Sequence, residues 1–455
     1  MSIINNALSG SMAAQAAVNA ASQNIANMNT RGYTHQGVLL AALAGSTAQS
    51  PGSGVEVKSL IRFSDSYKSQ QMWRAASDLG ARTQTQPYLT QLERVMGDNA
   101  SSISSGIDSF FKALNAAGVD PTSTPLRQQI VTAADAMAQH FNSINSVMSN
   151  QILSVHQQRD AMVPQINTTL ENIAALNGKI AGSGATGTNV SALIDARDQA
   201  IDDLAGKMAL EVIDQPDGSR SVSLKSGQPL VLGSIAGSIG TSLNPLNQQI
   251  VTLSFATSTF VVDNATVGGQ MGGLSEFETK TLLPMQQAVQ AIASQLAGAV
   301  NSQLALGKTM TGVSGGPLFV LAPGSSNILG ITPGFTAADL ALSASGAAGD
   351  SSNLQELIKI KNLSINVPSL GMVLIGDADT QLVGKLGVDS QKNKALLSTA
   401  NTVREQSVAD WLSTSGVNKD EEAVNLLEFQ KMFQANMKVI SVANDMFDAT
   451  LAMMR

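Results

Sequence analysis

Two glycine-rich stretches of the sequence are spelled like catalytic motifs, and the first contains a serine. Residues 312–316, GVSGG, fit the pattern G-x-S-x-G, which presents a nucleophilic serine on a turn from a strand to a helix. That arrangement requires a histidine later in the chain, but His35, His140 and His156 all precede Ser314. We therefore expect a loop at this position, and a serine hydrolase stays only as a remote alternative.

The second stretch, GSGATG at residues 182–187, fits the dinucleotide-binding pattern, and Asp202 stands about where a ribose-binding acid would be expected. The pattern needs a strand before it. Here it follows a helical pattern that ends near Ile180, so we expect a flexible loop between two helices. The three scattered histidines and the absence of cysteine predict no metal site, and we expect no cofactor.

Three consecutive acids, Asp420, Glu421 and Glu422, are the best candidates for paired carboxylates in acid–base chemistry. They follow Asn418, which with Glu421 forms a capping-box pattern at a helix start. Acids in the first turn of a helix complement its dipole by about 0.3–1 kcal/mol. The acids are therefore interpreted as structural, and the protein as not an enzyme.

The composition limits the partners. Against 27 Lys and Arg stand 34 Asp and Glu, a net charge of −7, so the chain has no basic surface for nucleic acid or anionic lipid. Charged residues make up 13% of the chain, about half the usual ~25%, which favours association between surfaces. No apolar run approaches the ~20 residues of a membrane span, and the N-terminus lacks the features of a cleaved signal peptide.

The elements that could position a site are long helices. The C-terminus has a coiled-coil-like seam with alternating steps of three and four, which predicts one helix on the order of 50 Å long from residue 418 to the end. The seam consists of Ala423, Leu426, Gln430, Phe433, Met437, Ile440, Asn444, Phe447, Leu451 and Met454.

The N-terminus has a leaner seam whose small and polar members predict close approach by another helix. A helix with one narrow apolar stripe gains most of its stability from tertiary contact. Either the two terminal helices pair with each other, or both pack only against helices of neighbouring subunits. The N-terminal seam consists of Ile4, Leu8, Ser11, Gln15, Val18, Ser22 and Ile25.

A third long helix is predicted to open at Thr124 and Pro125, with Pro164 kinking it. Residues 276–305 and 389–412 also have helical patterns. The apolar seam of the third helix consists of Ile130, Ala134, Met137, Phe141, Ile144, Met148, Ile152, Val155, Met162, Ile166, Ile173, Leu176 and Ile180.

Between the helices, β-branched runs predict a small inserted β domain, with PDG at residues 216–218 as its first hairpin turn. The fold class is therefore mainly α with inserted β: long coiled-coil-like terminal helices, a helical bundle and a small β-rich outer domain. The runs are 209–213, 221–224, 229–232, 250–255 and 259–262. The expected divisions begin with an inner axial helix (1–40), the first part of a helical rod (41–207) and the β-rich outer domain (208–266). A helical segment that returns to the rod (267–310) and a loop-rich, possibly β outer region (311–375) follow. The second part of the rod (376–417) and a second inner axial helix (418–455) complete the chain.

Several segments resemble one family. The stretch SQNIANMNTRGY at residues 22–33 is similar to the asparagine-rich motif of bacterial flagellar axial proteins. The rest of the chain resembles, more narrowly and in the same order, the hook-associated protein 1 family, the first junction proteins between hook and filament. The similar segments are 110–131, 170–180, 192–205, 267–284 and 415–451.

The resemblance implies terminal helices paired in an inner tube, export without a cleaved signal peptide, and an extracellular place in the flagellum. The implied partners are further copies of the chain, the hook protein, the second junction protein, an export chaperone and the export apparatus. Asn24, Asn27 and Asn29 would then satisfy backbone or neighbouring-subunit groups where the inner helix ends, with Gly32 and Tyr33 at the outward turn. We expect the assembly interface at these residues and at the larger apolar members of both seams.

Two features depart from the family pattern. His35 stands where an arginine commonly follows the Gly-Tyr pair, which puts a salt bridge at that point in doubt. The outer region is also short. The alternative within the same class is another axial protein, of the hook, the rod or the second junction.

Overall fold

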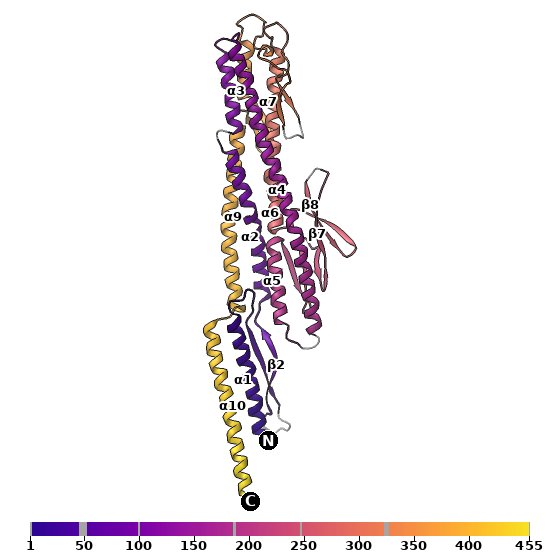
Figure 1. Cartoon of the computed structure of the whole chain (residues 1–455), viewed down its shortest axis with the longest axis vertical. Coiled ribbons are helices and arrows are strands. Elements are labelled where there is room, and N and C mark those ends of the chain that lie inside the picture. The colour runs from indigo at the N-terminus through magenta and orange to yellow at the C-terminus, as the bar shows by residue number, and fades with distance from the viewer. Residues whose placement is uncertain are drawn as a thin grey trace.

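The computed structural model describes residues 2–44, 52–98, 101–184, 188–245, 248–322 and 327–454. The molecule is elongated, with both chain termini at one end (Figure 1). As the sequence predicts, it is mainly helical with small antiparallel sheets. The helices form a terminal module at one end and a long rod above it.

The terminal module consists of α1 (Ser2–Asn27), the hairpin of β1 (Gln36–Leu43) and β2 (Gly54–Arg62), and α10 (Lys419–Met453). α1 and α10 run antiparallel and lie side by side (Figure 1). The side-chain amide of Asn436 lies against Gly10. Of the two possibilities that the sequence leaves open, the structure therefore has the terminal helices paired with each other.

α1 buries its small residues rather than its larger apolar ones. Ile4, Val18 and Ile25 of the predicted seam are half-buried, and Leu8 is 49% exposed. Small side chains let two helix backbones approach closely, so the alanines take the inner positions and leave the larger side chains at the edge. The buried residues of α1 are Ala7, Ser11, Ala13, Ala14, Ala17, Ala21 and Asn24.

α10 is held along one narrow side. Leu426, Phe433 and Ile440 of the predicted seam are half-buried, while Met437, Phe447 and Leu451 are exposed. Among its described residues only Glu422 is buried. The helix starts as predicted: the side chain of Asn418 accepts a hydrogen bond from Asp420 N at 3.0 Å.

The hairpin β1–β2 corrects two expectations from the sequence, an inner axial helix over residues 1–40 and a helical rod from residue 41. The strands pair antiparallel, from Gln36 opposite Arg62 to Leu43 opposite Gly54, with a register shift at Leu39/Leu40. Because that irregularity exposes two consecutive leucines, the strand lacks the strict alternation by which a half-buried strand is identified. Its end fits against α1, where a Cβ on Gly54 would lie 2.1 Å from Ser9 Oγ.

The rod is built on α4, and the predicted seam of that helix is confirmed: every member is buried except the half-buried Ile152. The helix begins as predicted at Thr124 and continues through Pro164 as one element. The rod helices are α2 (Ser66–Met96), α3 (Ile103–Ala117), α4 (Thr124–Gly184), α5 (Ser191–Lys207), α6 (Gly269–Phe277), the π-helical turn η1 (Glu278–Leu282), α7 (Leu283–Leu306) and α9 (Ala378–Ser415).

The inserted β domain flanks α4 and contains every predicted strand (Figure 1). The predicted PDG turn joins β3 to β4, and Gly218 adopts a left-handed φ of 81° there. One sheet has the order β3 (Leu210–Asp214), β4 (Arg220–Leu224), β5 (Pro229–Leu232), β6 (Ile235–Ala236); the other has β7 (Ser238–Leu243), β8 (Gln249–Phe255), β9 (Ser258–Val262). The β-branched runs in the sequence do not predict β6 and β7.

The loop-rich outer region at the far end of the rod contains two small hairpins, in agreement with the strands expected there, and a short helix that the sequence analysis did not predict. The hairpins are β10 (Phe319–Leu321) with β11 (Leu329–Ile331) and β12 (Ser364–Val367) with β13 (Gly371–Leu374); the helical turns are η2 (Ala337–Asp339), α8 (Ser352–Lys359) and η3 (Ile360–Asn362).

Candidate assembly interface

Asn24 closes the turn that follows α1. The side chain is 1% exposed, and both of its polar atoms make hydrogen bonds. Its Nδ2 donates to Gln36 O at 2.8 Å and to Glu422 Oε1 at 3.1 Å, while its Oδ1 accepts from Gln36 N at 3.1 Å and from Tyr33 OH at 2.9 Å. One asparagine therefore joins α1, the first strand residue and α10.

The other asparagines of the motif are less enclosed. The Nδ2 of Asn27 donates to Gln23 O at 3.0 Å within its own helix, and its Oδ1 accepts from Thr30 Oγ1 at 3.3 Å. Asn29 is exposed. Gly32 has a φ of 79°, a conformation that glycine adopts without the steric cost of a Cβ, and it turns the chain toward the hairpin. Asn27 and Asn29 thus lie at the surface.

His35, whose departure from the family pattern puts a salt bridge in doubt, contacts the carboxylate of Glu422. Its Nε2 lies 2.7 Å from Glu422 Oε1, and its ring stacks on Phe63 with centroids 4.6 Å apart. Glu422 belongs to the acidic run that the sequence analysis assigns to the helix dipole, so this one acid has a further role. Burial, with the nearby negative charges of Asp195 and Glu422, raises the pKa of Tyr33 to about 12.

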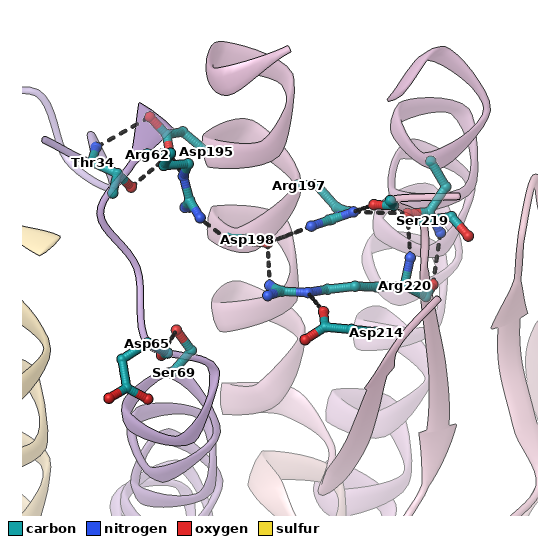
Figure 2. Close-up of polar contacts among 12 residues, drawn as sticks. Thr34, Arg62, Asp65, Ser69, Asp195, Arg197, Asp198, Asp214, Ser219 and Arg220 are labelled. Carbon is teal, nitrogen blue, oxygen red and sulfur yellow. Dashed lines mark hydrogen bonds and ion pairs between the residues drawn. The ribbon is translucent and has the colours of Figure 1, made fainter. Parts of the chain in front are cut away.

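Two aspartates of α5, Asp195 and Asp198, form what we call the aspartate row (Figure 2). Arginines from the hairpin and from the β domain donate hydrogen bonds to it. From the hairpin, Arg62 Nε donates to Asp195 Oδ1 at 2.7 Å, and its NH2 donates to Asp198 Oδ2 at 3.0 Å. Thr34 donates to the same Asp195 carboxylate from its backbone N at 3.1 Å and from its hydroxyl at 2.6 Å. The end of β2 and the turn after α1 are thereby fixed to α5.

The other side of the row comes from the β domain. Arg220 donates to Asp198, and its Nε donates to Asp214 Oδ1 at 2.6 Å (Figure 2). Its guanidinium also lies 5.3 Å from the ring centroid of Trp73, a cation–π distance. Arg197 NH2 lies 3.2 Å from Asp198 Oδ1. Three arginines and three aspartates therefore couple the hairpin, α5 and β3–β4, and so fix how the terminal module is oriented on the rod.

Further polar contacts complete the joint. Asp65 caps α2 directly after the hairpin, and Ser69 Oγ donates to its carbonyl at 2.9 Å (Figure 2). Asp202 accepts from Arg404 NH2 at 2.7 Å and lies 3.5 Å from Arg31 NH2. Sequence reasoning missed Arg404 and Arg31 as partners of Asp202 because they lie far from it along the chain; the acid-rich helix 191–207 was the only local signal.

Large apolar side chains are exposed over the terminal module. In a monomer of low charge, such a concentration marks a surface for association. The exposed apolar residues are Ile3, Leu8, Met12 and Met28 of α1 and its end, Leu39, Leu40, Leu43, Val57 and Leu60 of the hairpin, and Val424, Leu427, Met437, Val439, Val442, Met446, Phe447, Leu451 and Met453 of α10.

The motifs that resemble catalytic sites do not form them. Ser314 lies in an exposed loop, where Lys308 Nζ donates to its Oγ at 3.0 Å, and the histidines are engaged elsewhere. The stretch 182–187 follows helix α4 instead of a strand, and its residues 185–187 lie outside the described residues. Within the described ranges, no group of three metal-ligating side chains occurs. None of the described helices has the length and apolarity that crossing a membrane requires.

Comparison with known proteins places the chain in a class. Residues 4–34 match the family "Flagella basal body rod protein", and residues 409–453 match "Flagellar basal body rod FlgEFG protein C-terminal". The two matched segments hold the paired terminal helices, so the class is the flagellar axial proteins. Residues 89–319, just over half of the chain, match "Flagellar hook-associated protein FlgK helical domain". The chain belongs to the FlgK family of flagellar hook-associated proteins.

Relatives match over the full length. The Escherichia coli K12 protein named flagellar hook-associated protein 1 is 26% identical, with 99% of each chain covered. Its Bacillus subtilis namesake is 24% identical over 96% of this chain and 95% of its own. The structure of the flagellar hook junction protein FlgK from Burkholderia pseudomallei has the same fold, with a TM-score of 0.64 at 17% identity, covering 75% of this chain and 99% of that one.

Proposed function

We propose that this protein is a structural junction protein of the bacterial flagellum, which assembles on the distal end of the hook and connects it to the filament. The observation that carries the proposal is the exposed apolar surface of α1 and α10, in a chain whose full-length relatives are named hook-associated protein 1. The role is non-enzymatic and needs no cofactor. The protein acts outside the cell, as part of the flagellum.

Its mechanism is assembly that buries the terminal helices. The contacts that leave α10 with a single buried residue in the free chain supply little stability, so the helix gains its burial among neighbouring copies. Heterologous contacts of this kind build tubes and rings. The partners are further copies, the hook protein and the second junction protein, and an export chaperone covers the α10 seam before export.

Substitutions of Asn24 and Asn27 should have different effects, the first on folding and the second on assembly. Asn24→Leu should destabilise the terminal module, because it removes the bonds that Asn24 makes to both backbone groups of Gln36, a cost of about 1–3 kcal/mol for each group that is left unsatisfied. Asn27→Leu removes only local, half-exposed bonds, so helix content should persist while incorporation into flagella falls. Circular dichroism and immunogold counting measure the two effects; normal incorporation of Asn27→Leu would contradict an assembly role for Asn27.

The proposed function is tested by electron microscopy of a deletion strain, with an assay of filament protein in the medium. We expect hooks without filaments, filament protein lost to the medium, rescue by the full-length chain and no rescue by a truncation ending at Asn418. Missing hooks would instead assign the protein to the hook or rod. Normal filaments in the deletion strain would refute the junction role.

A further inference from the structure

A groove of about 940 Å³ lies where the terminal module meets the rod. Its apolar lining is made of small residues on two helices and two larger ones on the hairpin. We call it the corner groove: Ala16 and Ala20 of α1, Ala192 and Ala196 of α5, and Val57 and Leu60 of β2. None of these six side chains is buried, so the groove is open to an approaching partner.

The chemistry of the corner groove fits a partner with an apolar stripe rather than a charged one. Its polar lining is mainly carboxamide, including Asn19, Gln23 and Asn27. Its charged residues are already paired, Asp195 with Arg62 and Arg31 with Asp203 at 3.1 Å. A partner can therefore cover the groove without leaving an unpaired charge buried.

The chain itself has an unpartnered surface of matching character. The last part of α10 projects beyond the start of α1, so that the C-terminus lies further out than the N-terminus (Figure 1). From Asn444 to Met454 every side chain is exposed, and Phe447 is 62% and Leu451 48% exposed. We call these residues the α10 tail.

The α10 tail cannot reach the groove of its own chain. α1 and α10 are antiparallel, and the pairs Gly10 with Asn436 and Asn24 with Glu422 place Ala20 beside residue 426 or so. Phe447 lies about 20 residues further, or roughly 30 Å along the helix. The two surfaces are thus at opposite ends of the module, as in a head-to-tail contact between copies.

We propose that the corner groove of one copy receives the α10 tail of a second copy, displaced by roughly 30 Å along the helix axis. A helix about 10 Å across fills about 400 Å³ per turn, so a groove of this volume has room for about two turns. This inference rests on the proposed assembly function and identifies two surfaces that would meet in it. The contact continues the α1–α10 pairing onto a second side of α1.

The test uses disulfide trapping in isolated flagella, since the chain has no cysteine of its own. Ala20→Cys combined with Phe447→Cys should give covalent dimers on oxidation, at least tenfold more than either single variant. The matched control combines Ala20→Cys with Val439→Cys, which is also exposed on α10 but lies eight residues, or about 12 Å along the helix, before Phe447. Filamented flagella with no excess of dimers over this control would refute the groove contact while leaving the proposed function intact.

A second variant keeps the test valid if the cysteine pair fails to assemble. Ala196→Trp fills the groove from α5, so the purified chain should keep its melting temperature within about 2 °C, while fewer than a tenth of the hooks carry filaments. Ala395→Trp, at an exposed position of α9 outside the groove, should leave filament numbers normal. Normal filament numbers with Ala196→Trp would overturn the proposal.

Discussion

At the scale of single residues, the connection between the terminal module and the rod depends on Asp195. Its buried carboxylate accepts from Arg62 and twice from Thr34. Asp195→Asn removes the charge and presents an amide N–H₂ where only acceptors fit, so we expect a loss of about 1.5–3 kcal/mol in the free energy of unfolding. Asp203→Asn, on the exposed side of the same helix, should cost less than about 0.5 kcal/mol. Urea unfolding compares the two, and equal losses would contradict the role of Asp195.

Tyr33 makes the stability of the module depend on alkaline pH. Its pKa is about 12 in the folded chain, raised by burial and by Asp195 and Glu422, against an ordinary value of 10.0. Between these values the folded chain binds more protons than the unfolded chain, so the contribution is fully present below pH 10 and is lost as pH rises toward 12.

We therefore expect wild type to lose more stability than Tyr33→Phe between pH 9.5 and 11. The measurement is urea unfolding of both chains at each pH. Because the phenol is partly exposed, solvent reduces the size of the difference but does not change its sign. A steeper loss in Tyr33→Phe than in wild type would contradict the assignment.

At the scale of elements, Gly10 marks a close approach of α1 to the side chain of Asn436 on α10. A Cβ at this position would lie 2.7 Å from the side-chain oxygen of Asn436. Gly10→Leu should force the helices apart and speed hydrogen exchange along α10 by tenfold or more. The control is Gly298→Leu in α7, where a Cβ meets nothing within 4 Å and helix propensity favours the change. Unchanged exchange in Gly10→Leu would show that the close approach contributes little.

The sequence predicts an element well when the periodic spacing of its apolar residues can be read within that one segment. The seam of α4 is of this kind, because all of its periodic positions face one core, and α10 is recognisable although its stripe is mostly exposed. The hairpin was missed because its strands pack on α1 and leave Leu39, Leu40 and Leu60 exposed, which blurs the period of two. The family resemblance supplied the expectation that the termini pair, while the spacing alone left it open.

The candidate site was predictable only in part, since hydrogen-bond partners distant in sequence leave no spacing signal. The asparagine motif was identified, yet the role of Asn24 depends on Glu422, 398 positions away. The same holds for Arg62 and Asp195, which are 133 positions apart. His35 is a further example, because no local spacing rule selects Glu422 as the acid that its ring contacts.

At the scale of the whole molecule, the hydrophobic core and the terminal module are separate. The core cluster extends from Trp73 to Leu386 and includes no residue of α1, the hairpin or α10. The module is joined to the rod through the aspartate row, the turn at Thr34 and the backbone bond from His35 N to Ser415 O at 2.8 Å. The rod therefore has a hydrophobic core of its own, while many large apolar side chains of the terminal module stay exposed.

This separation predicts that a fragment of residues 66–415 folds by itself. It keeps the whole core, and the arginine–aspartate contacts of the β domain survive without Arg62. We expect a cooperative thermal transition within about 5 °C of the full chain, a range that corresponds to roughly 4 kcal/mol for a fragment of this length. The fragment should nevertheless fail to restore filaments in a deletion strain, because both assembly helices are gone. A fragment that does not unfold cooperatively would mean that the terminal module is part of the folding unit, and the exposed helices would then have to be explained by stability as well as by assembly.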